Sequence, residues 1–346
     1  MSGMQLEGGL KLSRTIRKQM IEALSRADGT FISGQALADV IGCSRTAIWK
    51  HIEDLRKSGV EIEAVRKKGY RLIKMPDVLI EGQILLGLET KTIGHKVVHF
   101  DSVESTQQIA HQLAVEGTPD GTVIIAEEQT GGRGRMARPW YSPKQKGIWM
   151  SLIVRPLLPL EKAPQFTLIA AIAVARAIEE VTKLDVKIKW PNDILHKGRK
   201  VTGILTEVQG EADQINYLVI GVGVNVNQTR TDFPDQLRDT ATSLLIEKGE
   251  LISRKKLVQS ILKFFEKYYT LYLEKGFVPL KIIWESYADR IGEIVTARTI
   301  NGDVVGIALG ITDEGVLIIQ DHMGKKHHIY SADIEFNHSN TNETLL

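Results

Sequence analysis

Hydrophobic residues recur every three or four positions in three segments near the start of the chain. This spacing predicts amphipathic helices over residues 14–26, 35–41 and 44–58. Gly42 can adopt the left-handed conformation that ends a helix, and Ser44 can cap the helix that follows it. Short helices joined by such a tight turn form a helix-turn-helix, which we therefore expect here.

Two short segments with strand-like alternation follow the third helix, at residues 62–65 and 70–73. They predict a hairpin, and a helix-turn-helix followed by a hairpin has the winged form. Polar and aromatic residues lie on the outer face of the third helix, and basic residues form the tip of the hairpin. The resulting candidates for DNA contact are Arg45, Thr46, Trp49, Lys50, Arg66, Lys67 and Lys68. A helical protein-interaction domain is the alternative interpretation.

Strand-like and helix-like segments alternate through the middle of the chain, which predicts a mixed α/β domain. The expected strands lie at residues 96–100, 122–126, 147–154, 187–190, 200–208 and 217–226. The expected helices lie at residues 102–116, 162–182, 254–275 and 278–289. The helix at 162–182 is apolar around most of its circumference, so we expect it in a core against the sheet.

The pattern changes near residue 290 to short segments that alternate like antiparallel strands. These segments lie at residues 295–299, 304–310, 315–320 and 325–330. Asn301-Gly302, between the first two, is a strong hairpin signal, and we expect a small β-barrel in this region. The predicted fold class is therefore α+β. The predicted domains are residues 1–75, 76–290 and 291–346, with Pro76 marking the first boundary.

Charge and cysteine content narrow the range of possible functions and cellular compartments. The first 75 residues carry 14 lysines and arginines against 8 aspartates and glutamates, whereas the whole chain has a net charge of only +2. Clustered positive charge is typical of a nucleic-acid binder. The single cysteine, Cys43, cannot form an internal disulfide, which agrees with a reducing cytoplasm. No apolar run reaches the roughly 18 residues of a membrane span, and the histidines lack metal-ligand spacing, so neither a membrane segment nor zinc is expected.

The stretch from Gly131 to Trp140 joins glycines with three arginines between two predicted strands. A glycine-rich backbone can turn several N–H groups toward one anion. Arg133, Arg135 and Arg138 add planar cations that match phosphate or carboxylate geometry, and Trp140 offers a flat apolar face. The alternative interpretations are a flexible basic surface loop or an arginine/glycine tract that binds RNA.

This stretch, with Gly132-Arg133-Gly134-Arg135, Arg138 and Trp140, resembles the adenylate-binding loop of biotin protein ligases. Other segments match that family in the same order: Ser105-Thr106-Gln107, Gln129, Lys189-Trp190-Pro191-Asn192-Asp193, Lys200-Val201-Thr202-Gly203-Ile204-Leu205 and Gly221-Val222-Gly223-Val224-Asn225. With its helix-turn-helix, the chain resembles the bifunctional bacterial type, a ligase and biotin operon repressor in one. The resemblance also implies that the C-terminal barrel is SH3-like and that residues 229–242 help to close over a nucleotide. Two positions depart from the family pattern. Ala137 stands where a glycine is frequent, and the last strand, at residues 334–337, lacks the arginine that often ends it.

The resemblance implies a set of site residues. Neutral donors and acceptors suit the ureido ring of biotin, and the implied biotin contacts are Ser105, Thr106, Gln107, Gln129, Gly132, Arg133, Lys200 and Gly203. Plain helix capping is the alternative for Ser105 and Thr106. The implied nucleotide contacts are Arg135, Arg138, Trp140, Asn192 and Asn225. The implied catalytic residues are Lys200, Arg133, Arg135 and Asp193, and Asp193 is also the expected magnesium ligand.

The implied reaction uses biotin, ATP and Mg²⁺ in two steps. The biotin carboxylate attacks the α-phosphorus of ATP, and the resulting biotinyl-5'-AMP passes its biotin to a lysine of a biotin carboxyl carrier protein, from acetyl-CoA carboxylase or another biotin-dependent carboxylase. The other implied partners are operator DNA and a second copy of the chain, as a dimer with the adenylate bound. Two alternatives stay open: a ligand-sensing transcription factor without ligase activity, and a lipoate-type protein ligase.

Overall fold

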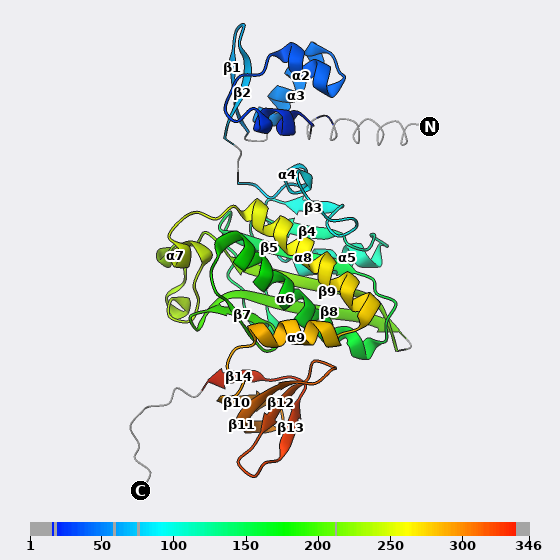
Figure 1. The fold of residues 1–346 in the computed structure, drawn as a ribbon, viewed down its shortest axis with the longest axis vertical. Helices are drawn as coiled ribbons and strands as arrows, with labels where there is room; N and C mark the ends of the chain where they lie inside the picture. Colours follow the sequence, from blue (N-terminus) through cyan, green and yellow to red (C-terminus); the bar gives the residue numbers. More distant parts are fainter. Residues whose placement is uncertain (1–15, 17–18, 58–59, 75–76, 212, 337–346) are drawn as a thin grey trace. The chain divides into compact units, whose positions relative to one another are not determined.

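The computed structural model describes residue 16 and residues 19–57, 60–74, 77–211 and 213–336 (Figure 1). Contacts between Cα atoms divide the chain into two compact units, Met1–Leu88 and Glu89–Leu346. The domain boundaries expected after residues 75 and 290 stay predictions. Within the described residues, none of the helices is both long enough and apolar enough to cross a membrane.

The first unit contains the expected helix-turn-helix and hairpin. Residues 19–26 are helical and precede α2 (Gly34–Ile41), α3 (Arg45–Lys57), the antiparallel strands β1 (Glu61–Val65) and β2 (Gly69–Lys74), and the short α4 (Glu81–Leu85). Gly42 ends α2 with a φ of 74°, and the Ser44 hydroxyl accepts a hydrogen bond from the Ala47 N–H, so the predicted turn and cap are confirmed. The first predicted helix extends over residues 14, 15, 17 and 18, and the third over residue 58, which lie outside the described residues.

The helices of this unit are stabilised by one shared apolar core. Met20, Leu24, Leu37, Ile48 and Ile52 are almost fully buried and pack together. Removing that much apolar surface from water offsets the entropy of ordering helices as short as these. The core holds α3 by one face and leaves its other face to solvent.

The second unit is built on a seven-stranded sheet in the order β3-β4-β5-β9-β8-β7-β6. The strands are β3 (Val97–Phe100), β4 (Val123–Ala126), β5 (Gly147–Val154), β6 (Lys187–Lys189), β7 (Asp193–His196), β8 (Arg199–Glu211) and β9 (Gln214–Asn225). Only the β3–β4 pair is parallel within this sheet. The predicted mixed α/β domain is thereby confirmed.

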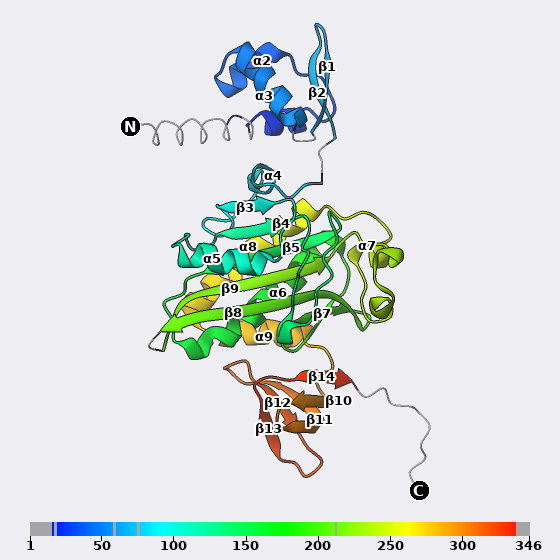
Figure 2. The ribbon, with the colours of Figure 1, turned by 180° about the vertical axis from the view of Figure 1, so that it is seen from behind.

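Helices cover both faces of this sheet. The helix α5 (Thr106–Val115) lies on one face, and α6 (Ala163–Thr182), α8 (Arg254–Lys275) and α9 (Val278–Tyr287) lie on the other (Figures 1 and 2). The predicted helix α6 is buried along most of its length, as its apolar circumference indicates. The long β8–β9 hairpin therefore offers one face to α5 and the opposite face to α6.

The structure differs from the sequence prediction mainly at short elements. The strand expected at residues 187–190 ends at Lys189, and the unexpected β7 begins at Asp193 and pairs with both β6 and β8. The helix α5 begins at Thr106 rather than at residue 102, and α7 (Leu244–Lys248) was not expected. Strands and helices of four or five residues are too short to show a clear period in the sequence.

The last part of the second unit is a five-stranded antiparallel sheet in the order β13-β12-β11-β10-β14. The strands are β10 (Ile294–Thr299), β11 (Gly302–Ile311), β12 (Leu317–Gln320), β13 (Lys326–Ile329) and β14 (Asp333–Phe336). The hairpin expected at Asn301-Gly302 joins β10 to β11. This confirms a small β domain. Its strands β13 and β14 form the two edges, and closure into an SH3-like barrel stays a prediction.

Candidate active site

A cavity of about 540 Å³ lies at the N-terminal end of α5, on the face of the sheet that this helix covers. Its walls come from α5, the arginine loop (residues 131–140), β5, the β6–β7 turn, β8, β9 and a segment at residues 233–241. The predicted site residues that line it are Ser105, Thr106, Gln107, Gln129, Arg133, Arg135, Arg138, Trp140, Asn192, Asp193, Lys200, Gly203 and Asn225. Gly132 lies in the loop beside the Ser142 side chain and is not part of the lining.

The floor of the cavity is formed where strand glycines let Trp140 lie on the sheet. Gly203 of β8 and Gly223 of β9 are cross-strand neighbours. A Cβ added to Gly203 would lie 3.0 Å from the Trp140 ring, and one added to Gly223 would clash with the indole Nε1. Glycine within a strand is typical of a bulge or of a close approach by another group, and here the group that approaches is the side chain of Trp140.

Neutral polar side chains meet at one end of the cavity. The backbone N–H and the hydroxyl of Thr106 donate to the Gln129 carbonyl oxygen, at 2.9 and 3.0 Å. The Thr106 and Ser151 hydroxyl oxygens are 2.9 Å apart, and Ser151 donates to the Gln107 carbonyl oxygen. Gln107 donates in turn to the backbone oxygen of Val219, at 3.0 Å. Thr106, Gln107 and Ser151 are buried, Gln129 is partly buried, and all four are already hydrogen-bonded, so their positions are fixed.

Ser105 occupies the N-cap position of α5, but its side chain makes no capping hydrogen bond. Plain capping was the alternative interpretation of this residue, and the structure does not support it. Ser105 is 2% exposed and lines the cavity beside Thr106 and Gln107. A buried hydroxyl at this place is available to a ligand.

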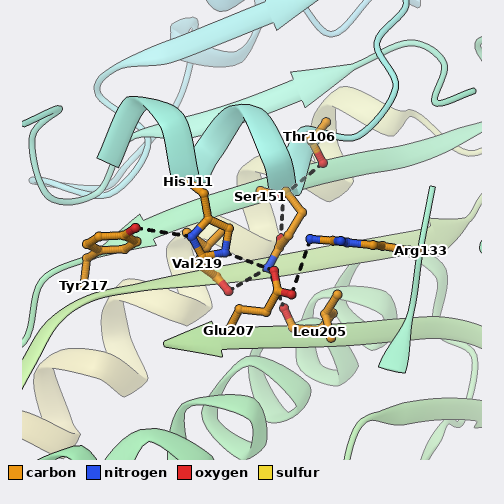
Figure 3. A network of polar contacts seen from close by, with 9 residues as sticks. Thr106, His111, Arg133, Ser151, Leu205, Glu207, Tyr217 and Val219 are labelled. Carbon is orange, nitrogen blue, oxygen red and sulfur yellow. Dashed lines mark hydrogen bonds and ion pairs between the residues drawn. The ribbon is translucent and has the colours of Figure 1, made fainter. Parts of the chain in front are cut away.

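Each arginine of the loop contacts an oxygen from a different part of the chain. An Nη atom of Arg133 lies 3.4 Å from the Glu207 carboxylate, which also contacts His111 (Figure 3). Arg135 donates to the Asn192 side chain at 3.1 Å and to the Ser331 hydroxyl at 2.9 Å. These contacts hold the loop over the cavity.

The C-terminal sheet also reaches the arginine loop. Arg138 forms an ion pair with Asp333, at the start of β14, and Asp333 lines the cavity. Ser331 and Asp333 were not among the predicted site residues, because nothing in the sequence places them near a loop about 200 residues earlier. Their carboxylate and hydroxyl oxygens occupy arginine donors that a phosphate could also use.

The arginine loop carries an unusual backbone conformation at its apex. Met136 and Ala137 have φ values of 54° and 56°, in the left-handed region that disfavours residues with a Cβ. Glycine adopts this region without that cost. A glycine is frequent at the position of Ala137 in the resembling family, and this geometry gives the physical reason.

Lys200 is the best-positioned cation of the cavity. The pairing of β7 with β8 skips Val201, and such a bulge re-aims the side chains beside it. The Lys200 Nζ lies 2.7 Å from a carboxylate oxygen of Asp193 and 5.3 Å from the centre of the Trp140 ring. The lysine is therefore placed on a strand, between the floor of the cavity and a carboxylate.

Lys189 is a second lysine of the cavity to which the sequence assigned no separate role, although it opens the Lys-Trp-Pro-Asn-Asp segment. Burial lowers the pKa of the Lys189 amine below its ordinary value, Asp193 acts in the opposite direction, and the charge of Lys200 lowers it further. A lysine whose pKa is shifted by burial beside charged partners is typical of a functional site.

Residues 229–242, which we call the closing segment, contribute another part of the cavity wall. The segment contains two short 3₁₀ helices, η3 (Arg230–Asp232) and η4 (Asp235–Leu237). Five of its residues line the cavity: Phe233, Leu237, Asp239, Thr240 and Ala241. The family resemblance implied that this region helps to close over the nucleotide, and the segment lies where it could do so.

Metal ligands are sparse around the cavity. Within the described parts of the chain, no three or more His, Cys, Asp or Glu side chains are grouped to hold a metal ion. Magnesium does not require such a group, because it is commonly held by one or two carboxylates together with substrate phosphates. Asp193 is therefore a chemically suitable ligand for a magnesium ion that arrives with a nucleotide.

The predicted DNA-contact residues lie on the surface of the first unit. Arg45, Thr46, Trp49 and Lys50 are all exposed on α3, and 59% of the Trp49 surface is accessible. Arg66, Lys67 and Lys68 are exposed at the β1–β2 turn. An exposed tryptophan on a helix whose other face is buried indicates an interaction surface.

Comparison with known proteins gives matches along most of the chain. Residues 99–225 match the biotin/lipoate A/B protein ligase family, residues 16–71 match an HTH domain, and residues 291–337 match the biotin protein ligase C-terminal domain. The sequence is 54% identical over 321 residues to the bifunctional ligase/repressor BirA of Bacillus subtilis (strain 168), which covers 93% of this chain and 98% of that protein.

This chain is also similar to proteins with lower sequence identity. The bifunctional ligase/repressor BirA of Escherichia coli (strain K12) is 31% identical over 298 residues, covering 85% of this chain and 89% of that protein. The biotin protein ligase from Aquifex aeolicus in complex with biotin and ATP has a similar fold, with a TM-score of 0.61 and 30% identity. That match covers 70% of this chain and 98% of the Aquifex chain.

Proposed function

The chain belongs to the bifunctional ligase/repressor branch of the biotin protein ligase family, and from this premise we propose what it does. It makes biotinyl-5'-AMP from biotin and ATP, transfers the biotin to a lysine of a biotin carboxyl carrier protein, and represses biotin genes. The observation that carries this proposal is a single cavity in which neutral polar side chains, Lys200 and the three loop arginines meet.

Biotin occupies the end of the cavity at α5. Its ureido ring has one carbonyl and two N–H groups, and Ser105, Thr106, Gln107 and Gln129 provide neutral donors and acceptors for them. The rest of biotin is apolar and lies along Gly203 and the neighbouring strand residues. The biotin carboxylate then points toward Lys200 and Arg133, whose positive charges attract it.

ATP occupies the part of the cavity between the arginine loop and the closing segment. Arg135 and Arg138 neutralise phosphate charge, and Asn192 and Asn225 provide neutral hydrogen-bonding groups on either side. Trp140 and the buried Phe233 provide apolar surface. Mg²⁺ bound through Asp193 would neutralise further phosphate charge.

The first chemical step joins the two ligands. A carboxylate oxygen of biotin attacks the α-phosphorus of ATP, the bond to the β-phosphate oxygen breaks, and pyrophosphate leaves. Lys200 bridges the attacking carboxylate and the α-phosphate, and Arg133 and Arg135 stabilise the charge that accumulates as the bond forms. All three cations line the cavity before the reaction, so little reorganisation is needed.

The second step transfers the acyl group. The neutral ε-amine of a carrier lysine attacks the carbonyl carbon of the mixed anhydride, and the bond from that carbon to the phosphate oxygen breaks. AMP leaves with the bonding electrons, the nitrogen loses a proton to solvent, and an amide bond remains. Asp193 is the carboxylate we assign to the incoming lysine. No covalent enzyme intermediate is needed, and the single cysteine, Cys43, belongs to the first unit.

The DNA-binding function uses residues 1–75, ligation uses residues 76–290, and residues 291–346 complete the ligation site through Ser331 and Asp333. The outer face of α3 reads operator bases, and the basic β1–β2 turn contacts phosphates. Two copies on two half-sites bind far better than one, so repression uses a homodimer that forms with biotinyl-5'-AMP bound. Operator DNA and a lone unpaired cysteine both fit the cytoplasm.

One incubation tests the ligase function against its alternatives. The protein is mixed with Mg-ATP and either biotin or lipoate, and acyl-adenylate and pyrophosphate are measured. We expect both products with biotin and neither with lipoate. Products with lipoate alone would favour a lipoate-type ligase, and absence of both products with biotin would favour a transcription factor without ligase activity.

A further inference from the structure

Glu247 is a buried carboxylate that lies outside the cavity yet contacts both of the segments that flank Lys200. Only 5% of its side chain is exposed. One carboxylate oxygen accepts from the Arg199 guanidinium at 2.5 Å and from the Thr242 hydroxyl at 2.6 Å. The other oxygen lies 3.4 Å from the His196 Nε2. Such short, charge-assisted bonds at a buried site are the strong kind.

The helix that carries Glu247 is tied to the end of β9. The N-cap Ser243 of α7 donates through its hydroxyl to the backbone oxygen of Gln228, at 2.6 Å. The Leu245 N–H donates to the Val226 oxygen at 2.8 Å. Ser243 and Gln228 are fully buried. The helix α7 is therefore fixed to the sheet, and Glu247 acts from a fixed position.

The closing segment is paired directly with the backbone of Lys200. The Lys200 N–H donates to the Thr240 oxygen at 2.8 Å, and the Thr242 N–H donates to the Lys200 oxygen at 2.9 Å. Two side chains are bonded to one Glu247 oxygen: Arg199, the residue before Lys200, and Thr242, the last residue of the closing segment. Glu247 holds the two sides of this pairing together.

We propose that Glu247 is a positioning residue for nucleotide binding: it clamps the closing segment to the Lys200 strand and so sets the position of the wall formed by Thr240 and Ala241. This rests on the proposed function, in which ATP lies between the arginine loop and that wall. The residues assigned to the ureido ring of biotin come from α5 and from Gln129, which lie elsewhere in the cavity and do not contact Glu247. Lys200 and Gly203, also assigned to biotin, lie on β8, which is held by its pairing with β7 and β9. Loss of the clamp therefore weakens ATP binding selectively.

The test is Glu247→Gln in the full-length protein. Glutamine keeps the size of the side chain but removes the charge that Arg199 and Thr242 share. We expect the KM for ATP in adenylate formation to rise about tenfold, the size of effect given by one charge-assisted hydrogen bond. The dissociation constant for biotin, measured by calorimetry without ATP, should change less than twofold. A merely structural defect would lower the active fraction without changing the KM for ATP.

A second variant keeps the test decisive if Glu247→Gln folds poorly. Thr242→Val replaces the buried hydroxyl with a methyl group and leaves the Arg199 contact intact. We expect a smaller rise in the KM for ATP, about threefold, again with unchanged biotin affinity. The matched control is Glu250→Gln, an exposed carboxylate near α7 that lies 3.9 Å from Lys248 and should leave both quantities unchanged.

An unchanged KM for ATP in Thr242→Val and in folded Glu247→Gln would overturn the proposal. Parallel losses of biotin and ATP affinity would also overturn it, because they would indicate general loosening of the cavity. Failure of the proposed function is distinguishable from these results, because it would show in the wild-type protein as a lack of adenylate formation.

Discussion

At the scale of single residues, two neighbouring strand glycines determine where the Trp140 side chain can lie. Gly203 and Gly223 leave the space into which Trp140 settles, with Lys200 above the ring. Any side chain at Gly223 must displace the indole, because the Cβ would occupy the position of its Nε1. The shape of the cavity therefore depends on having glycine, which lacks a Cβ, at both positions.

We predict that Gly223→Ala weakens binding of both biotin and ATP by tenfold or more, because a displaced Trp140 enters the cavity. Calorimetric titration of each ligand measures the effect, with circular dichroism to show that the fold is retained. Gly82→Ala is the control, since a Cβ at Gly82 meets nothing within 4 Å. Unaltered affinity for both ligands in Gly223→Ala would mean that Trp140 can move away without cost.

Lys200 and Arg133 should fail in different ways when they are replaced by alanine. Lys200 sits on a strand, so its loss should slow adenylate formation by about 10²–10³-fold. Arg133 sits on the loop, so its loss should also let the adenylate escape into solution. Pyrophosphate release reports synthesis, and filtration of the protein reports retention.

Lys197→Ala is the matched control for these two variants, because Lys197 is exposed in the adjacent turn and does not line the cavity. It should match the wild-type protein in both assays. Normal synthesis and retention in both Lys200→Ala and Arg133→Ala would refute the assigned roles.

The sequence could identify site residues where they form short runs that match a known family. The Gly-Arg-Gly-Arg run and Lys200 were found in this way, and the structure gathers them around one cavity. Ser331 and Glu247 could not be found, because an isolated serine or glutamate has no local pattern. Their importance comes only from contacts formed in three dimensions.

At the scale of secondary-structure elements, the side chain of Glu266 connects α8 to the first residues of the second unit. Glu266 of α8 accepts hydrogen bonds from the backbone N–H groups of Lys91, Thr92 and Ile93, at 2.7 to 3.0 Å. Burial alone raises the pKa of this carboxyl, but the backbone donors and the Thr92 hydroxyl outweigh it and lower the pKa below its ordinary value. The ionised carboxylate thus stabilises the fold.

We predict that Glu266→Gln lowers the unfolding free energy by about 1–2 kcal/mol at pH 7, because an amide offers only one acceptor oxygen. A folded-state pKa below the unfolded value of about 4.3 means that this stabilisation is present above pH 4.3 and is lost as the pH falls through the folded-state pKa. The difference in thermal midpoint between variant and wild type should therefore shrink in acid. Exposed Glu274 of the same helix provides the control, and an equal shift in Glu274→Gln would argue against the hydrogen-bonding explanation.

The two surface elements of the first unit should contribute differently to DNA binding. Replacing Lys67 and Lys68 with alanine should weaken binding to all sequences and reduce the salt dependence, because these residues contact phosphates. Replacing Trp49 with alanine should instead relax sequence preference. Binding to operator and scrambled DNA at several salt concentrations separates the two effects.

The control for these variants is Lys57→Ala, at the far end of α3, which should behave as wild type. The same loss of sequence preference in all variants would contradict the division between base and phosphate contacts. A helical protein-interaction domain would show no operator binding at all.

How well the sequence predicts an element depends on the length of its pattern. The helices α6 and α8 have several turns of periodic residues, and both were predicted within one residue of their ends. The short α7 and β7 were missed, because a single helical turn or four strand residues cannot show a period. These missed elements matter here, since α7 carries Glu247 and β7 begins with Asp193.

At the scale of the whole molecule, the question is how two copies of the chain associate. The strand β9 is flanked by β5 and β8, so it offers no open edge to a second copy. The pairing of β8 with β7 stops at Gly203, so among the described residues the stretch 205–211 of β8 has no strand on that side. A second copy could extend the sheet along that edge, since backbone groups there are free of another strand.

We predict that biotin together with ATP shifts the chain toward a dimer. Bound adenylate can change association only through a difference in its affinity for monomer and dimer. A coupling of about 1–3 kcal/mol is typical and corresponds to roughly 5–150-fold tighter association. Sedimentation and operator binding with and without both ligands measure it. An unchanged monomer–dimer balance and DNA affinity would remove the co-repressor role while leaving the ligase function intact.

Whole-molecule organisation was predictable in part from the order of motifs along the chain. A basic helix-turn-helix, an alternating α/β region and a short β region follow each other, as the predicted fold class states. The contact of the C-terminal strands with the arginine loop was not predictable, because neither partner has an apolar pattern that indicates it. Only the folded arrangement brings Arg138 to Asp333.

The contacts of Arg135 and Arg138 also have a consequence for the time course of synthesis. Their partners Ser331 and Asp333 lie 196 and 195 residues later in the chain. At roughly 5–20 residues per second, a ribosome makes those partners about 10–40 s after the loop. The helix-turn-helix needs only neighbours from its own short stretch, so it can fold long before the last strand is made. A nascent chain therefore carries a folded DNA-reading surface well before its arginine loop has all of its partners.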